Sequence, residues 1–268
     1  MNLENLCTQT LNLAVEVGEF IETERKQFTT GKVESKGLHN YVTYVDKSAE
    51  EQIIAGLRIL IPEAGFIAEE GTVRPELKKY NWVIDPLDGT TNFIHGLPPY
   101  AISIALMEEQ EVILGVVYEI CLRERFYAWK DSKAWLNGQE IHVSRANKVS
   151  NSLIATGFPY TNFEKLEQFM HSVRWFMKNS HGLRRLGSAA TDMAYVACGR
   201  FEGFYEYGLS PWDIAAAALI IERAGGRVSD FSGGKDYLFG GEIISTNDAI
   251  YNEFRDVIFN IMVKEKKL

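Results

Sequence analysis

One segment constrains this chain more than any other: residues 82–93 read WVIDPLDGTTNF. Three apolar residues lead to Asp85, and Pro86 restricts the residue before it to an extended backbone. Asp85 is therefore predicted to be the last residue of a buried strand. The chain then turns, and Thr90 is a residue type that often opens a helix. A helix start exposes unpaired backbone N–H groups, which suit a phosphate.

The two aspartates of this segment have two possible explanations. Asp85 and Asp88 lie three residues apart across a turn, where they can bracket Mg²⁺, which prefers oxygen ligands and keeps phosphate in its shell. Alternatively, Asp-Pro and Asp-Gly pairs are common in ordinary turns. The pair alone supports both explanations equally, and the Thr90-Thr91-Asn92 run that follows favours the phosphate site.

Two further acidic positions also end apolar elements. Glu69 and Glu70 follow the apolar run of residues 66–68, where a solvated pair at a strand end is the alternative. Asp213 follows Ser210 and Pro211, a pattern typical of a helix start in which Asp213 is the first-turn acid. The pattern alone favours this capping role for Asp213.

The charge balance connects these positions. The chain has 28 Lys and Arg against 36 Asp and Glu, a formal charge of −8, which argues against nucleic acid as the main ligand. An anionic substrate would then need positive charge from another source. If Glu69, Asp85 and Asp213 converge, their repulsion would force protonation unless a divalent cation is present. Such a cation would also supply the missing positive charge.

Hydrophobic periodicity predicts mixed α and β structure. Apolar residues at helical spacing predict a long helix over 3–21 and a second over 49–60, with Asp46 just before it as a capping residue. Strands are expected at 65–68, 82–85, 100–107, 112–118, 125–129, 153–156, 201–207 and 242–245, with a turn at Asn137-Gly138. Later helices are expected at 162–178, 189–198, 211–224 and 248–264. Because no linker-like stretch occurs, we expect two closely packed subdomains, 1–147 and 148–268, forming one compact unit.

Several classes of protein lose support. The chain has no GxGxxG, HExxH or GxSxG motif, and residues 229–236 lack the leading Gly and the hydroxyl of a P-loop. Cys7, Cys121 and Cys198 form no CxxC pair, which argues against a disulfide framework. No signal-peptide pattern is visible, and apolar runs stay far below the ~20 residues of a membrane span. We therefore expect a soluble cytoplasmic protein with no membrane partner.

Taken together, three segments resemble the inositol monophosphatase family of magnesium-dependent, lithium-sensitive phosphatases. They are AEEG at 68–71, the full segment at 82–93, and WDIAAA from Trp212 with Gly225-Gly226 behind it. The likeness covers essentially the whole chain. It implies an α+β fold, a layered αβαβα sandwich of the inositol monophosphatase and fructose-1,6-bisphosphatase type. It also implies a homodimer that hydrolyses a small phosphate monoester, foremost myo-inositol monophosphate, by in-line attack of metal-activated water.

The resemblance also implies roles for individual residues. Two or three Mg²⁺ ions would be held by the side chains or carbonyls of Glu69, Asp85, Leu87, Asp88 and Asp213. Phosphate would meet the N–H groups of Gly89 and Thr90. The catalytic group would be Glu69, Thr90 and Asp46, with Asp46 pairing with Thr90 to orient water. Asp88, Ala189, Glu206 and Asp213 would contact the substrate.

The alternatives for two of these residues are structural: a plain helix cap for Asp46 and an exposed strand position for Glu206. The chain departs from the family pattern at Ala217, where a Gly is usual. The loop 156–159 and the pair Arg184-Arg185 resemble bacterial members and border the expected leaving-group pocket. They leave open fructose-1,6-bisphosphatase, NADP phosphatase or phosphoadenosine phosphatase activity. A regulatory or binding protein on the same fold is the non-enzymatic alternative.

Overall fold

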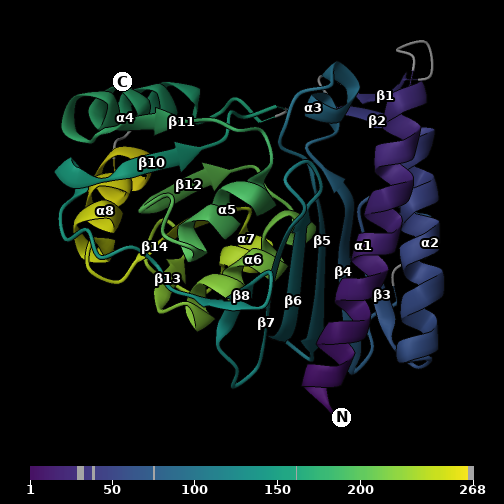
Figure 1. Ribbon diagram of the computed structural model, residues 1–268. Helices are drawn as coiled ribbons and strands as arrows, with labels where there is room; N and C mark the ends of the chain where they lie inside the picture. The colour runs from purple at the N-terminus through teal and green to yellow at the C-terminus, as the bar shows by residue number, and fades with distance from the viewer. Residues whose placement is uncertain (29–32, 38–39, 75, 161, 265–268) are drawn as a thin grey trace.

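The computed structural model describes residues 1–28, 33–37, 40–74, 76–160 and 162–264. Helices and sheets alternate in five layers, α-β-α-β-α, so the predicted layered α+β fold is confirmed (Figure 1). The first half contains α1 (Leu3–Gln27), β1 (Val33–Gly37), β2 (Asn40–Thr43), α2 (Tyr44–Leu60), β3 (Gly65–Ala68), β4 (Tyr80–Asp88), α3 (Thr90–His95), β5 (Ala101–Glu108), β6 (Glu111–Glu119), β7 (Glu124–Trp129), β8 (Ala134–Leu136) and β9 (Gln139–Ile141). The second half contains a 3₁₀ turn (Val149–Asn151), β10 (Leu153–Thr156), α4 (Leu166–Asn179), β11 (Gly182–Arg184), α5 (Ala189–Ala197), β12 (Gly203–Tyr207), α6 (Pro211–Arg223), β13 (Gly226–Ser229), α7 (Tyr237–Gly240), β14 (Glu242–Asn247), α8 (Tyr251–Ile258) and a π-helical end (Phe259–Lys264).

The first outer layer is the helix pair α1 and α2, which covers one face of the β3–β9 sheet (Figure 1). The apolar stripe of α1 is buried there, as its helical spacing predicts. Helix α2 begins earlier than the sequence suggested. Thr43 is its N-cap, and Asp46 lies inside the first turn, where its carboxylate accepts the Thr43 N–H to complete a capping box.

The larger sheet has the order β3-β4-β5-β6-β7-β8-β9 within the described residues. Strand β4 runs on to Asp88, so the prediction that Asp85 ends the strand is wrong. Pairing with β5 is irregular between Asp85 and Asp88, because Asp85 pairs with Ser103 and Asp88 with Ala101. Pro86 has no N–H to offer the ladder, and a bulge of this kind redirects side chains. Both aspartates thereby stay on one continuous strand.

Helices α5 and α6 form the central layer between the two sheets, and α4 and α8 cover the far face of the smaller sheet (Figure 1). That sheet has the order β11-β10-β12-β14-β13 within the described part of the chain. The alanines of α6 let it approach the larger sheet closely. A Cβ added at Gly115 on β6 would lie 2.5 Å from the Ala216 carbonyl oxygen, so this contact requires glycine.

Most predicted elements are confirmed with small shifts, and the Asn137-Gly138 turn joins β8 to β9 with both residues at positive φ. Strands β11 and β13 were not predicted, and the expected last helix is α8 followed by a π-helical segment. The two sheets lie on either side of the expected 147/148 boundary, which itself stays a prediction. Among the described residues, no helix combines the length and apolar character that crossing a bilayer would require.

Candidate active site

The turn between β4 and α3 brings the first group of predicted residues together. Gly89 adopts φ +94°, and a Cβ there would lie 3.0 Å from the Pro99 carbonyl oxygen and 3.2 Å from that of Gly187. Positive φ and two close backbones together require glycine at this position. Thr90 then begins α3, as the sequence predicted. The hydroxyl of Thr90 is placed to donate either to Asp46 Oδ1 at 2.9 Å or to the Leu87 carbonyl at 3.0 Å.

Asp85 is almost fully buried, with only 2% of its surface exposed. Its Oδ1 accepts the N–H of Leu87 at 2.9 Å, which stabilises the bulge. Burial raises the pKa of Asp85 well above its usual range, and the negative charges of Glu69, Asp88 and Asp213 raise it further. These four carboxylates, from three segments far apart in sequence, therefore share one electrostatic site.

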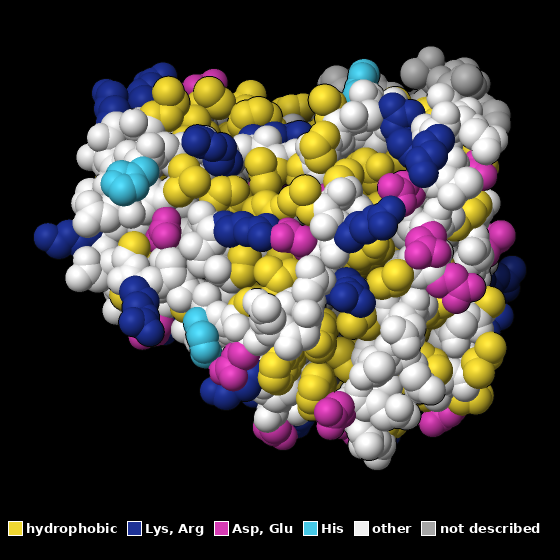
Figure 2. Space-filling view, viewed as in Figure 1, with side chains coloured by type: hydrophobic (Ala, Val, Ile, Leu, Met, Phe, Trp, Pro, Cys, Tyr) yellow, Lys and Arg dark blue, Asp and Glu magenta, His cyan; other side chains and the backbone are white. Residues whose placement is uncertain are grey.

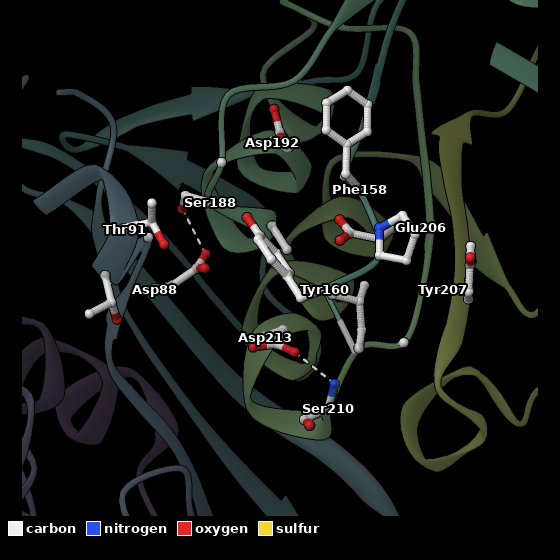
Figure 3. A pocket seen from close by; sticks show the side chains of 18 of the residues that line it. Asp88, Thr91, Phe158, Tyr160, Ser188, Asp192, Glu206, Tyr207, Ser210 and Asp213 are labelled. Carbon is white, nitrogen blue, oxygen red and sulfur yellow. Dashed lines mark hydrogen bonds between the residues drawn. The ribbon is translucent and has the colours of Figure 1, made fainter. Parts of the chain in front are cut away.

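Asp88 joins the two halves of the chain. Its Oδ2 accepts the Ser188 hydroxyl at 2.6 Å and the Ala190 N–H at 2.7 Å, both at the start of α5 (Figure 3). Burial raises the pKa of Asp88 to about 6, although these hydrogen bonds oppose the rise. The Asp88 carboxylate thus lies at the N-terminus of α5, where the helix dipole stabilises a negative charge.

Asp213 has the position that both of its explanations require. It lies in the first turn of α6, where Oδ2 accepts the Ser210 N–H at 2.6 Å, so the capping role is confirmed (Figure 3). Its carboxylate also lines the cavity that Asp88 lines. Burial raises the pKa of Asp213 well above its usual range, with the charge of Asp88 as the next cause. Capping therefore leaves Asp213 inside the acidic site.

A cavity of about 350 Å³ opens beside these groups, between the β4–α3 turn and the starts of α5 and α6 (Figure 3). The predicted residues that line it are Glu69, Asp88, Gly89, Thr90, Ala189, Glu206 and Asp213. Asp85, Leu87 and Asp46 lie outside this lining. Asp46 contacts the site through Thr90, and Leu87 through the same hydroxyl.

Glu206 lies at the far end of the cavity and is 7% exposed, so the alternative of an exposed strand position is wrong. Strand β12 is central in its sheet, and helices cover both faces of that sheet. A Cβ added at Gly157 would lie only 2.0 Å from the Glu206 carboxylate, so glycine makes room for it. Burial raises the pKa of Glu206 well above its usual range.

The loop 156–159 and Arg185 were expected to border the pocket, and Gly157, Phe158, Pro159 and Arg185 do line it, whereas Asp192 was not assigned a role from the sequence. Asp192 on α5 is 1% exposed, and its Oδ1 has no hydrogen-bond partner among the described residues. The Arg185 guanidinium lies over the rings of Phe158 and Tyr160, at 5.5 and 5.4 Å from their centroids. In the sequence, Asp192 is a single acid inside an ordinary helix pattern. Only the structure, which places it on the wall of the cavity, reveals it.

The composition of the cavity suits a divalent cation. Among the described residues that line it, the one basic side chain is that of Arg185. The acidic side chains of the lining are those of Glu69, Asp88, Asp192, Glu206 and Asp213. On the face drawn in Figure 2, basic and acidic side chains are interspersed among hydrophobic ones. Among the described residues, no three His, Cys, Asp or Glu side chains lie in an arrangement that could hold a metal ion as it stands. The fit therefore rests on donor chemistry. Carboxylate oxygens are ligands that Mg²⁺ prefers, and a cation would offset the repulsion between these like charges.

Fold and site together define a class: five-layer α+β proteins with a carboxylate-lined pocket between the two sheets. The model of the inositol monophosphatase family matches residues 2–259. This chain therefore belongs to the inositol monophosphatase family.

Named relatives agree with this assignment. The chain is 40% identical to an inositol-1-monophosphatase from Mesorhizobium japonicum, over 88% of this chain and 90% of the relative. It is 40% identical to the Nus factor SuhB of Escherichia coli K12, over 90% of this chain and 92% of that protein. The crystal structure of the extragenic suppressor protein suhB from Bartonella henselae has a TM-score of 0.89 at 34% identity, covering 95% and 98% of the two chains.

Proposed function

We propose that this protein hydrolyses a small phosphate monoester in a magnesium-dependent reaction, with myo-inositol monophosphate as the foremost substrate. The observation that carries the proposal is that the charges of Glu69, Asp88 and Asp213 all act on the buried carboxyl of Asp85, beside a cavity large enough for a small ester. Family membership and the inositol-1-monophosphatase relative support the same chemistry.

In this proposal, the carboxylates of Glu69, Asp85, Asp88 and Asp213 and the Leu87 carbonyl hold two or three Mg²⁺ ions. When bound, the ions neutralise the phosphoryl oxygens, lower the pKa of water and stabilise the leaving oxygen. The acidic pocket would otherwise repel a phosphate ester, since it contains one cationic side chain among the described residues.

The chain's own groups orient the reactants. The N–H groups of Gly89 and Thr90 bind phosphoryl oxygens at the start of α3. The Thr90 hydroxyl donates its hydrogen to Asp46 Oδ1, so its oxygen is free to accept a hydrogen bond from the attacking water. On the opposite side of the cavity, Glu206 and the Ala189 backbone contact the hydroxyl groups of the leaving alcohol. A substrate bound in the cavity is also less accessible to other water molecules.

A substrate panel tests the proposal. Phosphate release would be measured with myo-inositol 1-phosphate, fructose 1,6-bisphosphate, NADP and 3′-phosphoadenosine 5′-phosphate, in Mg²⁺, in EDTA and in Mg²⁺ with Li⁺. We expect the highest kcat/KM for the inositol ester, loss of activity in EDTA and inhibition by Li⁺. Preference for another ester would reassign the substrate, and turnover that survives EDTA would refute the metal-dependent reaction.

A binding role on the same fold is the second candidate, because several relatives at about 40% identity are named Nus factor SuhB. The two roles separate on an Asp88→Ala variant. A defined complex in cell extract that this variant still forms, while losing phosphatase activity, would support a second role.

We also propose a homodimer. Sedimentation velocity would then give a mass near twice the 30.3 kDa of one chain, and a mass of one chain would exclude it.

A further inference from the structure

A carboxylate outside the cavity lining fastens the turn that carries Glu69. Glu50 lies on α2 and is fully buried. Its Oε2 accepts the N–H of Glu70 at 2.7 Å, and its Oε1 accepts both the N–H and the hydroxyl of Thr72, at 2.8 and 2.6 Å. Three donors from two nearby residues therefore end on one side chain from another element.

This turn directly follows strand β3 and determines where Glu69 lies. The Glu69 N–H donates to the Ile84 carbonyl at 3.2 Å, which ties Glu69 to the neighbouring strand β4. The next residue, Glu70, is tied to Glu50. The backbone on each side of the Glu69 side chain is therefore fixed, and hydrogen bonds to a charged acceptor are stronger than neutral ones.

The same helix face holds a second part of the site. Asp46 and Glu50 are four residues apart on α2, so their side chains lie one above the other. Asp46 accepts the Thr90 hydroxyl at the start of α3, while Glu50 holds the turn after β3. One rigid helix thus sets the relative position of Thr90 and Glu69, which come from different segments.

We propose that Glu50 is a positioning residue for the cation site: its carboxylate orients the turn of Glu69 so that Glu69 can share a divalent cation with Asp85. This inference rests on the proposed function, because it takes Glu69 as a cation ligand. Glu50 itself touches neither substrate nor cation. Its contribution is to hold Glu69 in a geometry that would otherwise have to form when the cation binds.

The test is binding of Mg²⁺ alone, without substrate, measured by isothermal titration calorimetry. In Glu50→Gln, the amide oxygen can keep the two Thr72 donors, but the amide NH₂ then faces the Glu70 N–H, donor against donor. We expect the dissociation constant for Mg²⁺ to rise about tenfold, equivalent to about 1.4 kcal/mol. The matched control is Glu51→Gln, since Glu51 is the next residue on α2 and is exposed; it should bind as the wild type does.

A second readout separates positioning from a merely structural role. With Glu50→Gln, the Mg²⁺ concentration for half-maximal activity should rise by the same factor, while kcat at saturating Mg²⁺ stays within about threefold. A lower Tm with unchanged Mg²⁺ affinity would overturn the proposal.

If Glu50→Gln does not fold, Thr72→Ala decides. It removes one of the three hydrogen bonds at an exposed residue, and we expect about threefold weaker Mg²⁺ binding. Unchanged binding in Thr72→Ala would then overturn the proposal. A wild-type protein that binds no Mg²⁺ would overturn the proposed function together with this inference, whereas equal binding by wild type and Glu50→Gln would overturn only the inference.

Discussion

Replacing Asp46 by asparagine should reverse the direction of its hydrogen bond with the Thr90 hydroxyl. The Asp46 carboxylate accepts three hydrogen bonds: two from Thr43, at 2.8 and 2.6 Å, and one from the Thr90 hydroxyl at 2.9 Å. Asparagine has a single acceptor oxygen, which the two Thr43 donors would occupy. Its NH₂ group would then face Thr90 and donate to the hydroxyl oxygen, and the Thr90 hydrogen would turn to the Leu87 carbonyl.

The expected loss follows from this reversal. The Thr90 oxygen would no longer be free to accept a hydrogen bond from the attacking water. Groups that orient or deprotonate a nucleophile typically contribute about 10²- to 10⁴-fold, so kcat should fall at least about 100-fold. Stability should change little, because burial raises the pKa of Asp46 and a neutral amide avoids that desolvation cost. Weaker hydrogen bonds offset this gain, and we expect a Tm within about 4 °C of the wild type.

The assay is steady-state phosphate release at saturating Mg²⁺, with Thr90→Ala and Thr90→Ser as companions. Thr90→Ala should lose as much activity as Asp46→Asn, and the double variant should lose no more than either one, because both changes remove the same interaction. Thr90→Ser keeps the hydroxyl and should stay within about fivefold of the wild type. A folded Asp46→Asn protein with kcat within threefold of the wild type would show that the Asp46–Thr90 hydrogen bond does not orient the attacking water.

Three further outcomes are expected. Gly157→Ala should push the Glu206 carboxylate from its place, since the added Cβ would lie 2.0 Å from it; kcat/KM for a polyol phosphate should fall more than about tenfold, with p-nitrophenyl phosphate hydrolysis unchanged. Asp85→Asn should abolish activity but raise the Tm measured in EDTA, because a neutral amide avoids the cost of ionising a buried carboxyl beside three others; a lower Tm in EDTA would contradict the assigned repulsion. The pKa of Asp88 is raised to about 6 when folded, so its contribution to the stability of the metal-free protein is fully present below pH 4 and lost as the pH rises through 6. Urea unfolding in EDTA from pH 4 to 7 measures this, and Asp88→Asn should weaken the dependence.

Sequence patterns predicted the fold best where local and tertiary preferences agree. Strands β3 and β10 appear with the predicted bounds because each is a short apolar run that ends at turn-forming residues. Strands β11 and β13 lie at the edges of the smaller sheet, where burial is partial and apolar alternation is weak. Such strands depend on their neighbours for stability, so their own residues carry little signal.

The residues of the candidate site also differ in how far the sequence alone could predict them. The pair Asp85 and Asp88 could be found from one segment, because Pro86 and Gly89 mark the geometry around them. Glu50 could not be found in this way, since its hydrogen bonds join α2 to a turn about 20 residues away.

Asp213 shows why a local explanation does not exclude a functional one. Its carboxylate caps α6 and also faces the shared cavity. The cation, phosphate and substrate contacts of the residues that line the cavity stay predictions.

The most direct test of the central claim is anomalous diffraction from crystals soaked with Mn²⁺ and phosphate. We expect anomalous peaks between the carboxylates of Glu69, Asp85, Asp88 and Asp213, with phosphate density beside Gly89 and Thr90. Fully occupied Mn²⁺ elsewhere on the protein, with none among these four carboxylates, would contradict that claim.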